Sequence, residues 1–188
     1  MSQIRSFIAI ELSPHVKTKI GEIQKKMKSP PSDVRWVNTD GIHLTLKFLG
    51  ALDEERIPEL ADIIERCCTV CTPFTLTVRT LGAFPNEKNP KVIWVGAEEK
   101  TGTLARLQQD LEKKLSAIGF KEEKRTFSPH LTLGRLKSPK GERELTQSLA
   151  EYKDCECGTL EAHEVCLFKS DLRPGGAVYT KLRTFPFH

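Results

Sequence analysis

Two copies of the tetrapeptide His-Leu-Thr-Leu, at residues 43–46 and 130–133, are the segments of this sequence best suited to chemistry. The chain holds five His, and two of them stand in this identical context. At ordinary residue frequencies a given His is followed by Leu-Thr-Leu about once in a thousand cases or fewer, so chance explains the pair poorly. We therefore take His43 and His130 as the candidate catalytic residues.

The geometry of a β-strand places the His and the Thr of each copy together. Residues i and i+2 of a strand project from one face, ~6.6 Å apart along the chain. His43 therefore points the same way as Thr45, and His130 the same way as Thr132, while the Leu side chains turn toward the core. If the two strands face each other across a pseudo-twofold axis, two imidazoles and two hydroxyls converge in one cleft.

This set of groups fits acid–base catalysis at a phosphorus atom. An unperturbed His titrates near ~6.5, so at neutral pH one imidazole can accept a proton while the other donates one. The hydroxyls of Thr45 and Thr132 can donate hydrogen bonds to phosphoryl oxygens as negative charge develops. Attack of water on a strained five-membered cyclic phosphate needs these groups, and does not need the metal ions that most phosphoryl transfer uses.

The elements that position these residues follow from the spacing of apolar side chains. Alternation predicts strands over residues 4–12, 34–37, 42–49, 74–81, 92–96, 130–136, 158–168 and 177–185. Helical spacing predicts helices over residues 14–28, 53–68, 103–118 and 142–150. Turn-forming residues are expected to end the first helix at Pro30-Pro31, to end the first motif strand at Gly50, and to form loops at 85–90 and 174–176.

Strict alternation also assigns the side chains that follow the first His-Leu-Thr-Leu copy. It puts Phe48 on the core face with the Leu side chains. It puts Lys47 on the face of His43, where we expect a solvated ammonium group.

Strands interleaved with a few helices favour an α+β fold. We expect a bilobal, pseudo-twofold arrangement of two antiparallel β-sheets, with helices packed outside and a central cleft. Each half of the sequence offers a strand, a helix, a strand with His-Leu-Thr-Leu, and then a further helix and strands. Because no Gly- or Ser-rich linker separates the halves, residues 1–188 are expected to form a single domain whose two lobes share one core.

The composition bounds the class of protein. The net charge of +4 permits an anionic partner without requiring one. No run of about 18 apolar residues occurs, so no membrane span is expected. The first residues lack the pattern of a signal peptide, so a cytoplasmic location is expected.

The six Cys are too few for a disulfide scaffold and are expected to be thiols. Cys155, Cys157, His163 and Cys166 resemble zinc ligands at first sight, but their spacing matches no common zinc motif. We expect no metal site and no cofactor. The chain also lacks a Gly-rich phosphate loop with its lysine, which argues against ligation driven by ATP.

The sequence resembles the two-histidine phosphoesterase family, and within it the RNA 2′,3′-cyclic phosphodiesterases, also called 2′-5′ RNA ligases. The matching segments span nearly the whole chain: residues 5–10, 43–50, 82–85 with 92–94, 129–135 and 170–179. The resemblance implies an enzyme that hydrolyses the 2′,3′-cyclic phosphate end of RNA to a 2′-phosphate without a metal ion. It implies that His43 protonates the leaving 3′ oxygen and that His130 takes the proton from the attacking water. It also implies weak reverse 2′-5′ ligation, with tRNA halves as candidate substrates, and we expect a monomer.

The resemblance suggests two further substrate-binding residues. Arg135 matches an Arg that the family uses near the second motif, where it would contact phosphate. Strict alternation places Arg135 on the opposite face from His130, so it reaches the cleft only if the strand twists, bulges or ends near Gly134. Phe7 is the candidate to stack on the terminal base, with an ordinary core position as the alternative.

Two other functions fit the same residues. One is a non-catalytic module that binds RNA ends by charge and stacking. The other is the same hydrolysis performed on a small nucleotide that carries a cyclic phosphate. Two titratable imidazoles favour catalysis, because a pure binder would rely on Arg and Lys instead.

Overall fold

The computed structural model describes residues 3–28, 32–174 and 176–188. Pro30, Pro31 and Gly175, to which we assigned turns, lie outside the described residues. The strands are β1 (Gln3–Glu11), β2 (Val34–Trp36), β3 (His43–Asp53), β4 (Phe74–Asn86), β5 (Asn89–Glu98), β6 (His130–Leu136), β7 (Glu156–Ala162), β8 (Glu164–Arg173) and β9 (Gly176–Pro186). The α-helices are α1 (Pro14–Lys28), α2 (Ile57–Thr69), α3 (Thr103–Ala117) and α4 (Glu142–Glu151). Short 3-10 turns precede β3 (Thr39–Gly41) and α2 (Glu54–Arg56).

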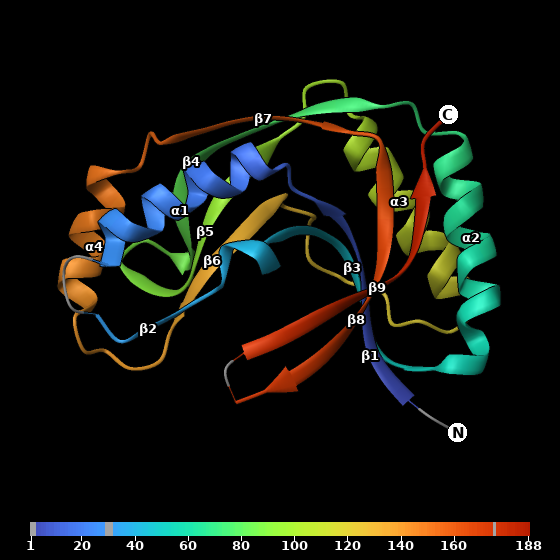
Figure 1. The fold of residues 1–188 in the computed structure, drawn as a ribbon, viewed down its shortest axis with the longest axis horizontal. Helices are drawn as coiled ribbons and strands as arrows, with labels where there is room; N and C mark the ends of the chain where they lie inside the picture. Colours follow the sequence, from blue (N-terminus) through green and yellow to red (C-terminus); the bar gives the residue numbers. More distant parts are fainter. Residues whose placement is uncertain (1–2, 29–31, 175) are drawn as a thin grey trace.

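The strands form two antiparallel sheets, which confirms the predicted α+β class (Figure 1). The first sheet has the order β3-β1-β8-β9, and the second has the order β2-β6-β5-β4-β7. The two strands that carry His-Leu-Thr-Leu, β3 and β6, belong to different sheets and contact each other. The sheets therefore meet where the two motifs lie.

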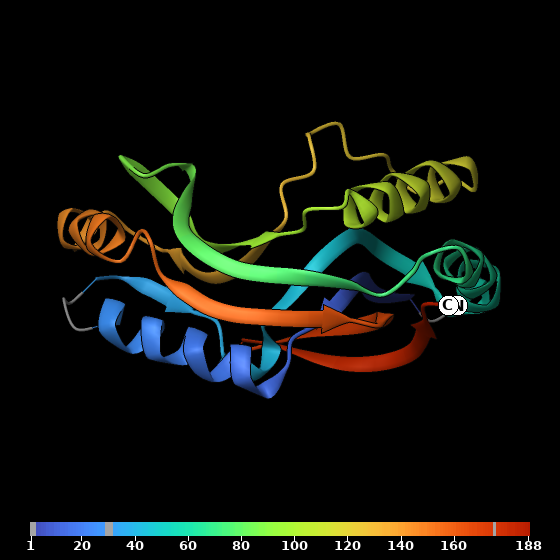
Figure 2. The same ribbon diagram turned by 90° about the horizontal axis from the view of Figure 1, so that it is seen from above.

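The lobes do not follow the halves of the sequence. The first sheet joins β1 and β3 to the last two strands of the chain, and the second sheet takes β2, β4 and β5 from the first half. Helices α2 and α3 pack together beside the first sheet, and α1 and α4 pack beside the second. Figure 2 shows β4 running from the end of the molecule that holds α2 to the end that holds α4.

One continuous apolar core lies beneath both sheets. It includes all four Leu of the two motifs and residues from every α-helix, among them Ile20, Ile64, Leu111 and Leu145. This core extends across both sheets, and the single domain of two lobes stays a prediction. No helix in the described part of the chain has both the length and the apolar character needed to cross a membrane.

The predicted helices are confirmed, whereas three predictions about the strands are wrong. The strand expected over 158–168 is two strands separated at His163. The loop expected over 85–90 continues the β4–β5 hairpin, and the Asn86 side chain accepts hydrogen bonds from the turn amides. Gly50 does not end β3, because a φ of 74° and a register shift against β1 let the strand continue to Asp53.

Candidate active site

Both motif strands contain a β-bulge at the same place. On β1, Ala9 pairs with Thr45 and Ile8 pairs with Lys47, so Leu46 is an extra residue. On β5, Trp94 pairs with Thr132 and Ile93 pairs with Gly134, so Leu133 is the extra residue of the second motif. A bulge of this kind reverses the alternation of all the side chains that follow it.

The bulge corrects two predictions about the first motif. Phe48, predicted for the core, is 66% exposed, and its ring lies 6.2 Å from that of Phe7. Lys47, predicted to be solvated, is 4% exposed and forms an ion pair with Glu112. Both predictions are wrong because they assumed unbroken alternation through Leu46.

In the second motif the same reversal brings Arg135 outward. The bulge that we allowed for near Gly134 is present at Leu133, one residue earlier, and the Arg135 side chain is exposed. Burial raises the pKa of Tyr179, while the charges of Arg135 and Arg5 lower it. Arg135 therefore lies within electrostatic reach of Tyr179, whose ring stands edge-on to His43 at 5.0 Å.

The two His side chains are oriented by the same backbone hydrogen bond. The Nδ1 of His43 lies 2.8 Å from the carbonyl oxygen of Gly41, and the Nδ1 of His130 lies 2.7 Å from that of Ser128. Because a carbonyl oxygen can only accept, Nδ1 carries the hydrogen in each ring. Each Nε2 is thereby left as the atom that can accept or deliver a proton.

His43 lies in an aromatic wall formed by Phe7, Phe168 and Tyr179. The rings of His43 and Phe7 stack at 4.5 Å, and the rings of Phe7 and Phe168 stack at 5.2 Å. Phe7 is only 3% exposed, so the structure supports the core alternative for this residue, where it holds the His43 ring. This position does not suit the predicted stacking on a base.

Burial lowers the pKa of His43 below its ordinary value of 6.5. The Gly41 hydrogen bond raises this pKa, nearby Lys17 lowers it, and Glu11 raises it. The neutral ring is therefore favoured in the free protein, and a bound anionic phosphate would favour the protonated ring.

A hydrogen bond joins β2 to the end of β8, and a cavity lies beside His43. The Arg35 guanidinium of β2 donates a hydrogen bond to the carbonyl of Pro174, next to the β8–β9 turn, at 3.3 Å. A cavity of about 290 Å³ opens beside His43, with Lys17, Asp40 and Tyr179 among its lining residues. Pro174 is therefore in contact with the second sheet, and the cavity is lined by residues of the first sheet, of α1 and of the 3-10 turn before β3.

His130 has a different neighbourhood. Phe84 of β4 stands edge-on to its ring at 4.9 Å, and the Trp94 ring lies 6.4 Å away. The His130 and Thr132 side chains are half-buried, as are those of His43 and Thr45. The structure thus places each predicted His beside its predicted Thr; the meeting of both pairs around one phosphate stays a prediction.

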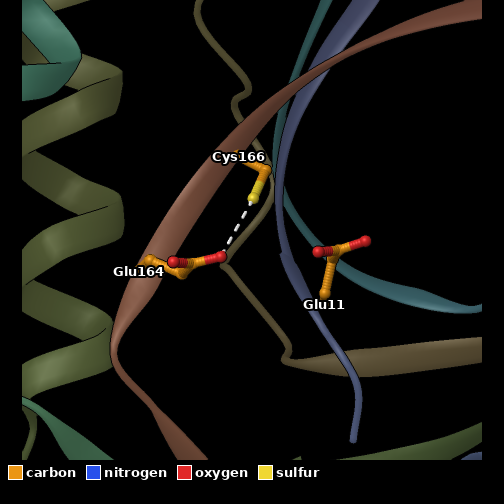
Figure 3. Close-up of side chains that lie close together, drawn as sticks. All are labelled: Glu11, Glu164 and Cys166. Atoms are coloured by element: carbon orange, nitrogen blue, oxygen red, sulfur yellow. Dashed lines mark hydrogen bonds between the residues drawn. The ribbon is translucent and has the colours of Figure 1, made fainter. Parts of the chain in front are cut away.

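A cluster of potential metal ligands lies near the aromatic wall (Figure 3). The ligand atoms of Glu11, Glu164 and Cys166 lie within 4.8 Å of one another. However, Lys181 pairs with Glu11, the Cys166 thiol donates to Glu164 at 3.7 Å, and burial raises the pKa of that thiol to about 11. These partners satisfy the cluster without an ion. Within the described residues, the zinc-like set of Cys155, Cys157, His163 and Cys166 does not gather at one point.

Sequence reasoning missed three aromatic residues of this site. Phe48 was assigned to the core, and Phe168 and Tyr179 belong to the last two strands, which carry no motif of their own. The pairing of β8 with β1 brings them to His43. The only signal in the sequence was the resemblance over residues 170–179, which includes Tyr179.

Comparisons with known proteins agree on one family. A family profile described as the 2′-5′ RNA ligase superfamily matches residues 12–173. A protein from Archaeoglobus fulgidus named RNA 2′,3′-cyclic phosphodiesterase is 36% identical over 183 residues, which cover 97% of this chain and 99% of the relative. A protein of the same name from Methanothermobacter thermautotrophicus is 32% identical and covers 97% and 98%.

Solved structures give the same result. The crystal structure of TT0787 from Thermus thermophilus has a TM-score of 0.82 and 30% identity, and 98% of each chain is covered. The structure of E. coli LigT complexed with 3′-AMP has a TM-score of 0.79 and 26% identity, and 99% of each chain is covered. The similarity therefore extends over the whole fold.

Proposed function

This chain belongs to the 2′-5′ RNA ligase superfamily, and on that premise we propose that it is an RNA 2′,3′-cyclic phosphodiesterase that forms 2′-phosphate ends. The observation that carries the proposal is the matched geometry of the two motifs. In each, a bulged strand presents a His and a Thr side by side, and a carbonyl oxygen two residues earlier holds Nδ1. Two Nε2 atoms are left for proton transfer.

The proposed reaction is an attack of water on the cyclic phosphate. Nε2 of His130 takes a proton from the water while the new P–O bond forms. The P–O3′ bond breaks, and protonated His43 delivers a proton to the departing 3′ oxygen. Thr45 and Thr132 donate hydrogen bonds to the non-bridging oxygens. Proton exchange with solvent then restores both rings.

The environment of His43 has a consequence for this assignment. Burial favours its neutral form, whereas the proposed acid must start protonated. The negative charge of the bound phosphate stabilises the imidazolium, so substrate binding and proton uptake by His43 are coupled. The wall of Phe7 and Tyr179 keeps the ring in one orientation while its charge changes.

Two exposed residues are suited to the RNA itself. The Arg135 guanidinium presents a planar set of donors that fits a phosphate. Phe48, next to the buried Phe7, offers a free ring face on which the terminal base can stack. The reverse ligation of tRNA halves, the monomeric state and the cytoplasmic location belong to the same proposal.

The deciding experiment uses an oligonucleotide that ends in a 2′,3′-cyclic phosphate, with excess EDTA. We expect conversion to the 2′-phosphate isomer at an unchanged rate in EDTA. Binding without turnover would support the RNA-end module instead. Faster turnover of a 2′,3′-cyclic mononucleotide than of the oligonucleotide would support the small-nucleotide enzyme. Activity that disappears in EDTA and returns with a divalent ion would contradict the proposal.

A further inference from the structure

Lys47 forms a buried polar contact that the proposed chemistry does not use. Its ammonium group pairs with the Glu112 carboxylate of α3 and donates a hydrogen bond to the carbonyl of Lys121 at 2.8 Å. Glu112 in turn accepts from the backbone amide of Glu123 at 2.7 Å and from the Gln108 side chain at 3.4 Å. The Lys47 side chain is 2% exposed and that of Glu112 is 12% exposed.

Stability alone explains such a pair poorly. Removing two charges from water costs free energy that their attraction only partly returns, so an apolar pair of similar size is often as stable. A buried ion pair with several hydrogen bonds does fix the groups that it joins in one arrangement.

The pair joins the strand of the first motif to the segment that leads into the second motif. Lys47 lies four residues after His43 on β3, and the bulge turns it to the side of α3. Glu112 holds the segment 119–129, which connects α3 to β6 without regular structure. That segment ends in Ser128 and Pro129, and the Ser128 carbonyl oxygen accepts the hydrogen bond of His130 Nδ1.

Apolar packing anchors this segment at Phe120 and Phe127, which contact the core, and not between them. The side chains of residues 121–126 are all exposed, whereas their backbone is held by the hydrogen bonds to Lys47 and Glu112. The second motif has no equivalent contact, because its fifth residue is Gly134, where a Cβ atom would lie 2.7 Å from a methyl group of Val34. Such a side-chain contact is therefore made only from the strand of the first motif, and it reaches the segment that leads into the second motif.

We propose that Lys47 and Glu112 are positioning residues that set the orientation of His130. The pair holds the backbone at Lys121 and Glu123, and packing of Phe127 holds the end of the segment. The Ser128 carbonyl, which follows Phe127, directs Nε2 of His130 toward the cleft. This role rests on the proposed cyclic phosphodiesterase activity, and it adds a group that does not touch the substrate.

The test compares three variants: Lys47→Met, the double variant Lys47→Met/Glu112→Leu, and Lys113→Met as the control. Lys113 is the exposed neighbour of Glu112 on α3. The double variant removes both charges, so it avoids an unpaired buried carboxylate and keeps the fold testable. We expect its kcat to fall roughly 10- to 100-fold because the imidazole is misplaced, with KM changed less than about twofold. The control should keep the wild-type kcat.

A second readout does not depend on turnover. Amide hydrogen exchange at Glu123 should accelerate in the double variant, and the NMR signal of the His130 Nδ1 hydrogen should weaken or broaden, while that of His43 persists. A folded double variant with wild-type kcat and an unchanged His130 signal would overturn the positioning role. Wild-type protein that is inactive on the cyclic phosphate would instead overturn the proposed function, and the His130 signal would still decide the positioning role.

Discussion

The two His-Leu-Thr-Leu segments share their backbone geometry and differ in most of the side chains that surround it. Both have the same bulge and the same carbonyl on Nδ1. His43 lies in the aromatic wall, with a pKa lowered by burial, whereas His130 has Phe84 edge-on to its ring and Trp94 farther away. The repeat thus specifies where each imidazole points, and the neighbouring strands bury His43 enough to lower its pKa.

The position after the bulge extends this contrast. The sixth residue of each segment is exposed, and it is Phe48 in the first and Arg135 in the second. The fifth residue is buried, and it is Lys47 in the first and Gly134 in the second. The same backbone geometry therefore presents an exposed aromatic ring in one strand and an exposed cation in the other.

The largest effect should come from removing either imidazole. We expect His43→Ala and His130→Ala each to lower kcat by about 10²–10⁴-fold, since each ring carries one proton transfer. Thermal melting should show that both variants stay folded. If either variant keeps its kcat within about tenfold of wild type, the two segments are not partners in one reaction.

A smaller effect, on substrate binding, should distinguish the role of Phe48 from that of Arg135. Loss of base stacking in Phe48→Ala should weaken substrate binding by ~1–3 kcal/mol at any salt concentration. Loss of the charged contact in Arg135→Ala should weaken binding by ~1.5–3 kcal/mol at low salt and by less at high salt. KM measured at two ionic strengths checks both, with Arg135→Lys as the control that keeps the charge. An Arg135→Ala effect independent of salt would contradict the phosphate role.

The packing around the second bulge can be tested through Gly134. A Cβ atom there would lie 2.7 Å from a Val34 methyl group and 3.1 Å from the Trp36 ring. We expect Gly134→Ala to lower the free energy of unfolding by ~1–3 kcal/mol, measured in urea. Gly21→Ala in α1, where nothing lies closer than 3.4 Å, should be neutral or raise stability by up to ~1 kcal/mol. Equal changes in the free energy of unfolding of the two variants would show that β2 leaves room for a larger residue at the bulge.

The smallest effect concerns the proton affinity of His43. Because burial lowers its pKa in the folded state, the unfolded chain binds the proton more tightly. The stability of the neutral, buried ring is fully present above the unfolded pKa of about 6.5 and is lost as pH falls toward the lowered pKa. The free energy of unfolding of wild type should therefore fall more steeply between about pH 7 and pH 5 than that of His43→Asn. Parallel curves for the two proteins would show that His43 is not desolvated.

The sequence was sufficient for the helices, for the strands that carry the motifs and for the pairing of each His with its Thr. Those features depend on the local spacing of apolar residues, and the motif that marks the strands occurs twice in the sequence. The bulge at Leu46 was not predictable, because no Gly or Pro stands beside it and pairing with β1 decides the register. The bulge at Leu133 stands next to Gly134, near which the sequence allowed for one. The burial of Lys47 depends on Glu112, 65 residues away, and the aromatic wall around His43 depends on β8 and β9. Both features depend on tertiary contacts between distant parts of the sequence, so local patterns do not predict them.

The exchange of strands between the sheets has a consequence for synthesis and for truncation. Phe168 and Tyr179 reach His43 only through the final hairpin of the polypeptide. A nascent chain that has already made both histidines still lacks two of the aromatic rings beside the first, and β1 still has an unpaired edge. The first sheet can thus form only after β8 and β9 have been synthesised, and neither half of residues 1–188 contains a whole sheet.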